Sequence, residues 1–499
     1  MNKFRSSGIL LPIFSLPSPY GVGTLGKVAY DFVDFLSSTG STFWQILPLN
    51  VTSYGDSPYQ SPSSVGLNYY FIDLDVLIEK GLLHKEDIDG VELFTDKHYV
   101  SYGLLFNNRI PLLKKAFSRF NKDDSDFQNF EKEGTYKDFA FYMTVKTLQN
   151  HRPWYEWDEY YKTYSPELEE KVLAEHKDLY LFYVWTQYEF LDEYFKLKNY
   201  ANLKGIKIIG DLPLYLSYDS VEAYKYPQLF QFDEKHQPVV VAGCPPDAFT
   251  EDGQLWGNPI YDWDSMEKDG YSFFNNRINY NLKLFDIVRI DHFRGFSSYY
   301  AIPYGRSNAR VGKWIKGPGM KLFKGKENLP IIAEDLGVLD DDVLKLLKDT
   351  TYPGMKILEF AFDGDKTNMH LPSNITENFF CYTGTHDNMP LLGYLLTLSE
   401  KEFSVFKKMV KEEAEKFSVP YDDSSLPKLV RTVASLCYAT KAEGAILIYQ
   451  DVLALGKESR INFPSSLSTS NWSYRFTAEQ FNDDVREFIK GNNERYNRH

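Results

Sequence analysis

The chain has 499 residues, of which 43% are hydrophobic and 25% charged, and this is the composition of an ordinary globular protein. The formal net charge of −14 argues against nucleic acid as a partner, because phosphate groups need a basic surface. No apolar run approaches the ~18 residues of a membrane span, so we expect no membrane association. A chain of this length can form one large domain with insertions, or two or three domains.

The remaining composition favours a protein of the cytoplasm. Its three cysteines, Cys244, Cys381 and Cys437, lack metal-ligand spacing and suggest a reducing compartment. The N-terminal run GILLPIF is short and interrupted by Pro12, so we do not expect a signal peptide. Aromatic residues reach 16%, which fits a large core, although some rings could also line a sugar-binding cleft.

Eight short apolar runs, separated mostly by helix-like segments, recur along the chain. Their hydrophobicity is continuous rather than alternating, which is typical of strands buried on both faces in a parallel sheet covered by helices. Eight such strands predict a (β/α)8 barrel, in the α/β class. The runs are 7–14, 42–49, 206–215, 285–293, 329–337, 354–362, 378–388 and 444–455.

Uneven spacing of the runs predicts insertions between strands 2 and 3 and between strands 3 and 4. We expect the barrel to comprise residues 1–65 and 191–499, with a mainly helical subdomain over 66–190. Residues 216–284 are rich in Pro, Gly and Asp around 242–263 and predict a loop-rich insertion that borders an active-site cleft. The last residues, GNNERYNRH, are expected to be frayed.

Acidic residues stand at the ends of several predicted strands, where barrel enzymes place their active sites. Asp211 follows IKIIG, Asp291 follows IVRI, Glu334 follows PIIA and Asp387 follows YTGTH. Any one of them could instead be a helix N-cap or a member of a loop ion pair. Four converging on one barrel mouth would raise each other's pKa at a cost in stability, which favours a functional role.

Two of these carboxyl groups form a candidate catalytic pair. Alternate residues of a strand share a face, so Arg289 should lie beside Asp291 and favour its ionised form as a nucleophile. Glu334 follows an apolar run and could keep its proton as general acid, which completes the carboxyl pair of a glycosidase. His292 and His386 would bind sugar hydroxyls. No third ligand is evident for a metal, and we expect no metal and no cofactor.

The glycine-rich stretch GVGTLG (21–26) imitates a dinucleotide fingerprint. No acidic ribose ligand closes a βαβ unit around it, so we interpret it as a tight turn after the first strand.

The order RIDHFRG, AEDLG and GTHDN resembles the signature regions of α-amylase-like retaining enzymes. The fuller resemblance is to the amylomaltase family of 4-α-glucanotransferases (disproportionating enzymes, glycoside hydrolase family 77), and it covers essentially the whole chain except 66–190. Family stretches include GDSPYQSPSS (55–64), GDLPLYLSYDS (210–220), GQLWGNPIYDW (253–263), PIIAEDLG (330–337) and NWSYR (471–475).

The resemblance implies a role for each matching residue. Asp291 would be the nucleophile, Glu334 the general acid/base and Asp387 the stabiliser of the transition state, with Arg289 and His386 as catalytic partners. Tyr59, Asp211, Trp256, Asn258, His292 and Asn462 would contact the substrate. The implied reaction moves a segment of an α-1,4-glucan to the 4-hydroxyl of glucose or a maltooligosaccharide through a β-glucosyl-Asp intermediate. The oligomeric state remains open.

Some positions depart from the family pattern, namely Thr24, Ala248, Phe273, Phe274 and the segment Pro464, Ser465 and Ser466. None of them lies in the proposed catalytic set, but Ala248 puts the grip on the acceptor glucan in doubt. Two alternatives to a transferase stay open. One is an α-1,4-glucan hydrolase that uses the same carboxylates with water, and the other is a non-catalytic glucan-binding barrel.

Overall fold

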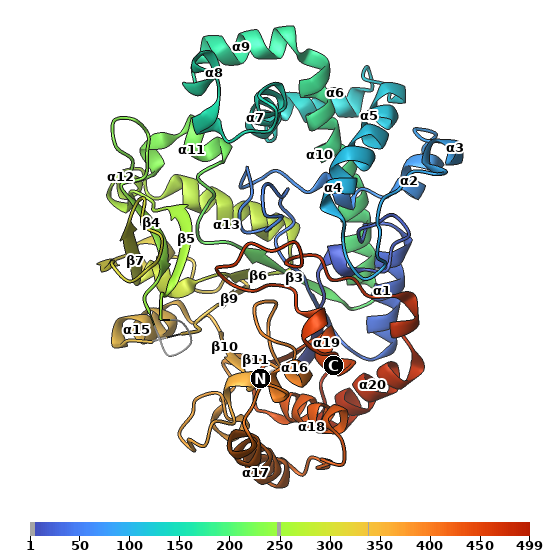
Figure 1. Ribbon diagram of the computed structural model, residues 1–499, viewed down its shortest axis with the longest axis vertical. Coiled ribbons are helices and arrows are strands. Elements are labelled where there is room, and N and C mark those ends of the chain that lie inside the picture. Colours follow the sequence, from blue (N-terminus) through green and yellow to red (C-terminus); the bar gives the residue numbers. More distant parts are fainter. Residues whose placement is uncertain (1–4, 247–250, 338) are drawn as a thin grey trace.

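The structure is a computed structural model that describes residues 5–246, 251–337 and 339–499 (Figure 1). Its centre is a sheet of eight parallel strands in the order β10-β11-β12-β1-β2-β3-β6-β9. The two ends of this order meet, because the Ala333 N–H donates to the Pro353 carbonyl at 2.9 Å. The sheet is therefore a nearly closed (β/α)8-type barrel, and the predicted fold class is confirmed.

Each barrel strand lies within one of the eight predicted runs, except that β1 begins one residue earlier, at Ser6. The strands are β1 (Ser6–Leu10), β2 (Phe43–Gln45), β3 (Lys207–Leu212), β6 (Ile287–Ile290), β9 (Ile331–Ala333), β10 (Gly354–Ile357), β11 (Phe379–Tyr382) and β12 (Gly444–Ile448). One face of these strands forms a compact apolar cluster that includes Leu10, Ile209, Ile332, Ile357 and Ile446. Side chains alternate along a strand, so the residues two positions after Ile209, Ile332 and Ile357 continue the inward-facing rows.

The outer layer of helices is irregular. Long helices flank most barrel strands, namely α1 (Lys27–Ser38), α10 (Lys177–Leu203), α13 (Ser272–Leu284), α15 (Asp341–Thr350), α17 (Glu400–Phe417), α18 (Leu426–Ala439) and α20 (Asp483–Tyr496). Between β6 and β9, a segment that the structure describes in full, the only α-helix is the short α14 (Met320–Phe323). The segment between β10 and β11, also fully described, has only the 3-10 turns Leu358–Phe360 and Pro372–Asn374 as helical elements.

The connection between β2 and β3 is rich in helices, which surround the upper part of the molecule in Figure 1. They are α2 (Leu74–Glu79), α3 (Lys85–Ile88), α4 (Tyr102–Leu104), α5 (Ile110–Arg119), α6 (Ser125–Glu133), α7 (Lys137–Leu148), α8 (Glu159–Lys162) and α9 (Pro166–Glu175). Several begin at a side chain that accepts backbone N–H groups, such as Asp73, Asp124 and Ser165. Many tyrosine and phenylalanine rings here are buried, so much of the aromatic content is core.

A second sheet lies beside the barrel and was not predicted. It is antiparallel, in the order β5-β4-β7-β8, with β4 (Val240–Cys244), β5 (Gln254–Pro259), β7 (Ser298–Pro303) and β8 (Lys313–Lys316). The short helices α11 (Val221–Lys225) and α12 (Trp263–Lys268) flank its first two strands in sequence. Glycine and proline in β4 and β5 hide their pattern, and every residue of β8 is exposed. Ala248, the departure singled out from the sequence, lies outside the described residues.

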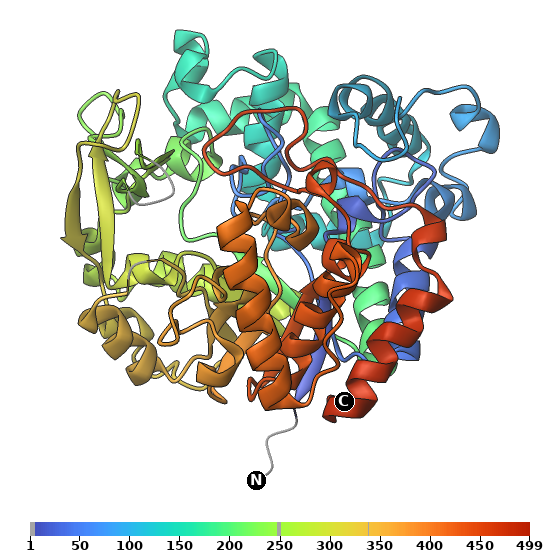
Figure 2. The ribbon, with the colours of Figure 1, turned by 60° about the horizontal axis from the view of Figure 1, so that its bottom comes forward.

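The C-terminal residues are ordered, so the expectation that they fray is wrong. Helix α20 lies beside α1 (Figure 2), and Arg498 after it is fully buried. Its guanidinium donates to the carbonyls of Ser6, Tyr438, Thr440 and Ala442 at 2.6–3.1 Å. These carbonyls lie next to the start of β1 and β12, so Arg498 joins the two strands that begin and end the barrel. Among the described residues, no helix combines the length and apolarity that crossing a membrane requires.

Candidate active site

The ends of three neighbouring strands, β3, β6 and β9, bring the first predicted residues together (Figure 1). The register of β3 and β6 places Asp211 opposite Arg289. The register of β6 and β9 places Ile290 opposite Ala333, so Asp291 and Glu334 come next on adjacent strands. Backbone bonds continue this register, because the Glu334 N–H donates to the Ile290 carbonyl at 3.0 Å.

Arg289 divides its guanidinium between two carboxylates. Nη1 donates to both oxygens of the buried Asp211 at 2.8 and 2.7 Å, and Nη2 lies 3.1 Å from Asp291 Oδ1. The expected contact between Arg289 and Asp291 is therefore present. Asp211 also accepts the Tyr59 hydroxyl at 2.7 Å. The Asp291 side chain keeps 29% of its surface exposed, whereas that of Arg289 keeps 5%. Of these two side chains, only the nucleophile candidate Asp291 is accessible from outside.

Burial raises the pKa of Asp291 well above its ordinary value, and Arg289 lowers it only in part. Asp211, Glu334 and Asp387 add to the rise because like charges repel. This differs from the sequence-based expectation that Arg289 holds Asp291 ionised. The main reason is burial, which outweighs Arg289, and Asp211, which binds the other end of the guanidinium, adds to the rise.

The Glu334 carboxyl group is fixed by two backbone N–H groups. Oε2 accepts the N–H of His292 at 2.6 Å and Oε1 accepts that of Leu336 at 2.9 Å. Burial raises the pKa of Glu334, while Arg289 and these two N–H groups oppose the rise. A carboxyl group with a raised pKa, held in one orientation, can deliver a proton to a defined position.

His292 has a strained backbone that serves this arrangement. Its φ of 49° is in the left-handed region, which a non-glycine residue adopts rarely and mostly at functional sites. The imidazole meets the Trp256 ring edge to face, with centroids 4.7 Å apart. Burial lowers its pKa to about 3, and Nε2 is buried without a partner among the described residues. A neutral imidazole next to Glu334 thus keeps an unused polar atom.

Asp387 arrives from the other side of the barrel, on the turn that follows β11. Its Oδ1 accepts the Asn462 amide at 2.7 Å and lies 3.4 Å from His386 Nε2. Burial lowers the pKa of His386, against the effect of Asp387. The His386 ring stacks on Tyr59 with centroids 5.2 Å apart, which links Asp387 to the Asp211 side of the site.

Asn258 contacts Gln60, a residue that the sequence interpretation missed. Asn258 lies in β5, where its Oδ1 accepts the Gln60 amide at 2.9 Å. Arg460 was also missed; it donates to the Asp387 carbonyl at 2.6 Å. So was Trp472, whose ring lies 5.6 Å from Tyr59 and 5.8 Å from His386. Gln60 lies in the family-like stretch GDSPYQSPSS and Trp472 in NWSYR, so the resemblance pointed to both regions. No local sequence pattern pointed to Arg460.

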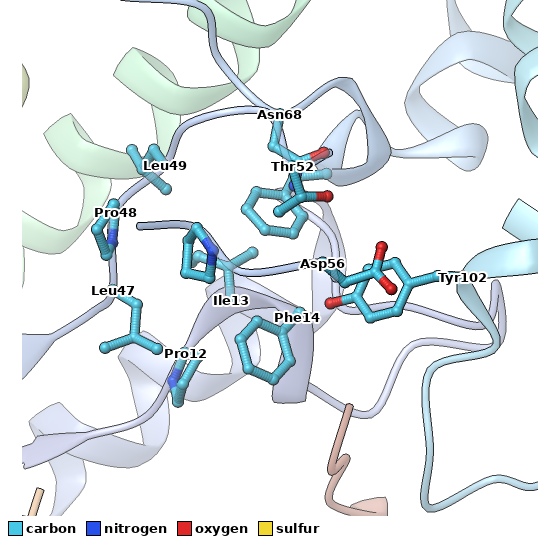
Figure 3. Close-up of a pocket in the computed structure, with 12 residues that line it drawn as sticks. Pro12, Ile13, Phe14, Leu47, Pro48, Leu49, Thr52, Asp56, Asn68 and Tyr102 are labelled. Carbon is cyan, nitrogen blue, oxygen red and sulfur yellow. The ribbon is translucent and has the colours of Figure 1, made fainter. Parts of the chain in front are cut away.

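A pocket near the ends of β1 and β2 is separate from these residues (Figure 3). Its lining includes Phe14, Thr52, Asp56 and Tyr102, and burial raises the pKa of Asp56 to about 6. The enclosed volume is about 10 Å³, enough for one water molecule and far too small for a sugar ring. In the part of the chain that the structure describes, no three His, Cys, Asp or Glu residues are grouped as metal ligands.

An eight-stranded parallel barrel with paired carboxyl groups at its strand ends defines an enzyme of the (β/α)8 class, of the kind that acts on glycosidic bonds. A profile of glycoside hydrolase family 77, described as 4-alpha-glucanotransferase, matches residues 11–480. The chain belongs to this 4-alpha-glucanotransferase family.

Individual relatives agree over almost the whole chain. The 4-alpha-glucanotransferase of Clostridium butyricum is 45% identical over 96% of this chain and 97% of its own length. That of Thermus thermophilus is 40% identical over 95% of each. The solved structure of amylomaltase from Streptococcus agalactiae in complex with acarbose is 38% identical, covers 99% of both chains and has a TM-score of 0.93.

Proposed function

We propose that this protein is a 4-α-glucanotransferase, which moves a segment of an α-1,4-glucan to the 4-hydroxyl of glucose or a maltooligosaccharide. The observation that carries the proposal is the placement of Asp291 and Glu334 at the ends of adjacent strands. Arg289 contacts the Asp291 carboxyl group, and two backbone N–H groups donate to that of Glu334. Maltooligosaccharides, α-1,4-glucans and glucose are then its partners, and no cofactor takes part. The net charge and the cysteine usage support a place in the cytoplasm.

The first step cleaves the glucan. An Asp291 carboxylate oxygen forms a bond to the anomeric carbon of the donor sugar, and the bond from that carbon to the glycosidic oxygen breaks. Glu334 gives its proton to that departing oxygen, which leaves as the 4-hydroxyl of the released fragment. The raised pKa of Glu334 supports this role, because the group must hold a proton before the reaction begins.

The second step transfers the glucosyl segment. Glu334, now a carboxylate, takes the proton of an acceptor 4-hydroxyl while the oxygen attacks the anomeric carbon and displaces Asp291. Two displacements at one carbon retain the α configuration. This mechanism requires the two carboxyl groups to lie roughly 5–5.5 Å apart, and that separation stays a prediction.

The surrounding side chains hold the reacting sugar. Asp387 and His386 would bind its hydroxyls and stabilise the positive charge of the transition state, with Asn462 orienting Asp387. Arg289 would orient Asp291 and, by its charge, limit the rise of its pKa, while the buried Asp211 fixes Arg289. The free Nε2 of His292 supports a hydroxyl contact there, and the rings of Tyr59 and Trp256 suit the apolar faces of sugars. Asn258 completes the proposed binding set.

Product analysis after incubation with maltotriose tests the activity. Transfer yields glucose together with maltopentaose and longer chains, whereas a hydrolase yields only shorter sugars. Asp291→Asn should lose at least a thousandfold of this activity but still bind maltotriose, because it removes the nucleophile and keeps the shape. A wild-type protein that binds maltotriose but leaves it unreacted would favour the non-catalytic alternative. Substantial turnover by Asp291→Asn would show that Asp291 is not the nucleophile.

A further inference from the structure

Two buried carboxyl groups outside the proposed reaction flank the strand that leads to Asp387. Glu359 follows β10, and Asp451 lies in the short helix α19 (Tyr449–Val452) after β12. In the barrel β11 lies between β10 and β12, so the two acids stand on either side of its end. The turn 383–391, which follows β11 (Figure 1), begins there, and His386 and Asp387 belong to it.

The two acids hold opposite parts of this turn. Asp451 Oδ1 accepts the Leu391 N–H at 2.7 Å, and its side chain also interacts with Thr383. The Glu359 N–H donates to the Thr383 carbonyl at 3.2 Å, and the Glu359 side chain interacts with Asn388. Asn388 in turn accepts the N–H and hydroxyl of Thr385 at 2.9 and 2.8 Å, within two residues of Asp387. Both the start and the end of the turn therefore depend on these acids.

Each acid has one carboxyl oxygen without a partner in the part of the chain that the structure describes. Glu359 is 9% exposed and Asp451 1%, and Glu359 Oε2 and Asp451 Oδ2 are buried without a hydrogen bond among the described residues. The charged and titratable groups that face Glu359 are Asp451, Arg460 and Tyr394. Arg460 is engaged by the carbonyls of Asp387 and Asn462.

Burial favours the neutral form of both groups. It raises the pKa of Glu359 to about 8, with a further contribution from Asp451, and raises the pKa of Asp451 to about 7. A buried carboxylate oxygen without a partner is costly, so at pH 7 Glu359 is mostly protonated and Asp451 is about half protonated.

We propose that Glu359 and Asp451 are positioning residues, which act as neutral carboxylic acids to hold the turn 383–391 and thereby aim Asp387 and His386 at the reacting sugar. This rests on the proposed function, because it assigns Asp387 to that sugar. Ionisation of Glu359 at alkaline pH places a charge beneath the turn, next to Asn388. The turn loosens and sugar binding weakens, whereas Asp291 and Glu334, on β6 and β9, keep their places.

Calorimetric titration with maltotetraose between pH 6 and pH 9 tests this, in a Glu334→Gln background that removes turnover and the titration of the acid. We expect the affinity of this protein for maltotetraose to fall roughly tenfold between pH 6 and pH 9. At pH 9, one unit above the pKa of Glu359, only about a tenth of the Glu359 side chains still carry the proton. Glu359→Gln added to this background should lose less affinity between pH 6 and pH 9, because glutamine mimics the neutral acid, and the double variant with Asp451→Asn should bind nearly as well at pH 9 as at pH 6. Asp451→Asn should likewise reduce the fall.

The matched control is Glu193→Gln in the same background. Glu193 is also a buried glutamate with a raised pKa and an unpaired oxygen, but its other oxygen accepts the Asp73 N–H, far from the turn. This variant should keep the pH dependence of the background. The same loss of affinity with and without Glu359→Gln would overturn the positioning role alone. Failure of the Glu334→Gln protein to bind maltotetraose at any pH would overturn the proposed function as well.

Discussion

Arg289 shows how one residue can serve two carboxylates at once. Its Nη1 binds the fully buried Asp211 and its Nη2 reaches Asp291, so the charge that Asp291 receives is shared. The planar guanidinium allows this double contact, which a lysine ammonium could not reproduce with the same geometry. The electrostatics of Asp291 thus depend on a third residue, Asp211, from a different strand.

Glu334→Gln is the residue-scale test of the general acid. We expect turnover of maltotriose to fall at least a hundredfold, while aryl α-glucosides with good leaving groups lose far less, because their departure needs no proton. The wild type needs protonated Glu334, so its activity should decline as the pH rises through the raised pKa. The variant should lose that decline with the activated substrate. Equal losses on both substrates would remove Glu334 from the acid role.

At the scale of elements, the N-cap of helix α15 connects the helix to the turn that follows β6 and carries His292 and Arg294. Asp340 Oδ1 accepts the Val343 N–H at 2.9 Å, and Oδ2 lies 3.1 Å from Arg294. Arg294 also stacks over Trp314 of β8, 3.8 Å from the ring centroid. Arg294 follows His292 by two residues. The guanidinium of Arg294 therefore joins helix α15, strand β8 of the second sheet and the turn that carries His292.

Asp340→Ala should therefore affect both stability and turnover. Loss of the cap should lower the unfolding free energy by about 1 kcal/mol. Release of Arg294 should also reduce kcat/KM for maltotriose severalfold. Asp124→Ala removes the comparable cap of α6, remote from the site, and should cost similar stability without a change in kcat/KM. Thermal unfolding measures the stability of both variants, and kinetic assays measure kcat/KM. Equal changes of kcat/KM in the two variants would show that the link through Arg294 is absent.

At the scale of the whole molecule, the barrel is completed by residues that are far apart in sequence. β1 pairs with β12, and Arg498 satisfies carbonyls next to both. Its environment is apolar enough that burial lowers the pKa of Arg498 to about 10. Such a group is stable only while its donors remain paired.

Arg498→Met should lower the unfolding free energy by about 3 kcal/mol, because several buried carbonyls lose their donors together. Thermal unfolding followed by circular dichroism measures this as a lower midpoint. Arg495→Met, an exposed arginine three residues earlier, should change the unfolding free energy by less than about 0.5 kcal/mol. An unchanged midpoint in Arg498→Met would show that these hydrogen bonds contribute little.

The sequence by itself determined the eight barrel strands and the polar residues at their ends. Burial on both faces forces a local run of apolar residues, and such a run is visible without any knowledge of its neighbours. Arg289 and Asp291 were predicted to meet for the same reason, since strand alternation is a local property.

Only the tertiary structure decided the second sheet, the burial of Arg498, and the roles of Gln60, Arg460, Glu359 and Asp451. Each depends on contacts between segments that lie far apart along the chain, such as Glu359 with Asn388 or Asp451 with Leu391. The direction of the Asp291 pKa shift also needed the structure, because it follows first from burial and then from the carboxylates that the fold gathers around Asp291. A local pattern fixes which face of a strand is apolar, but only closure of the barrel brings charges from different strands within reach of one another.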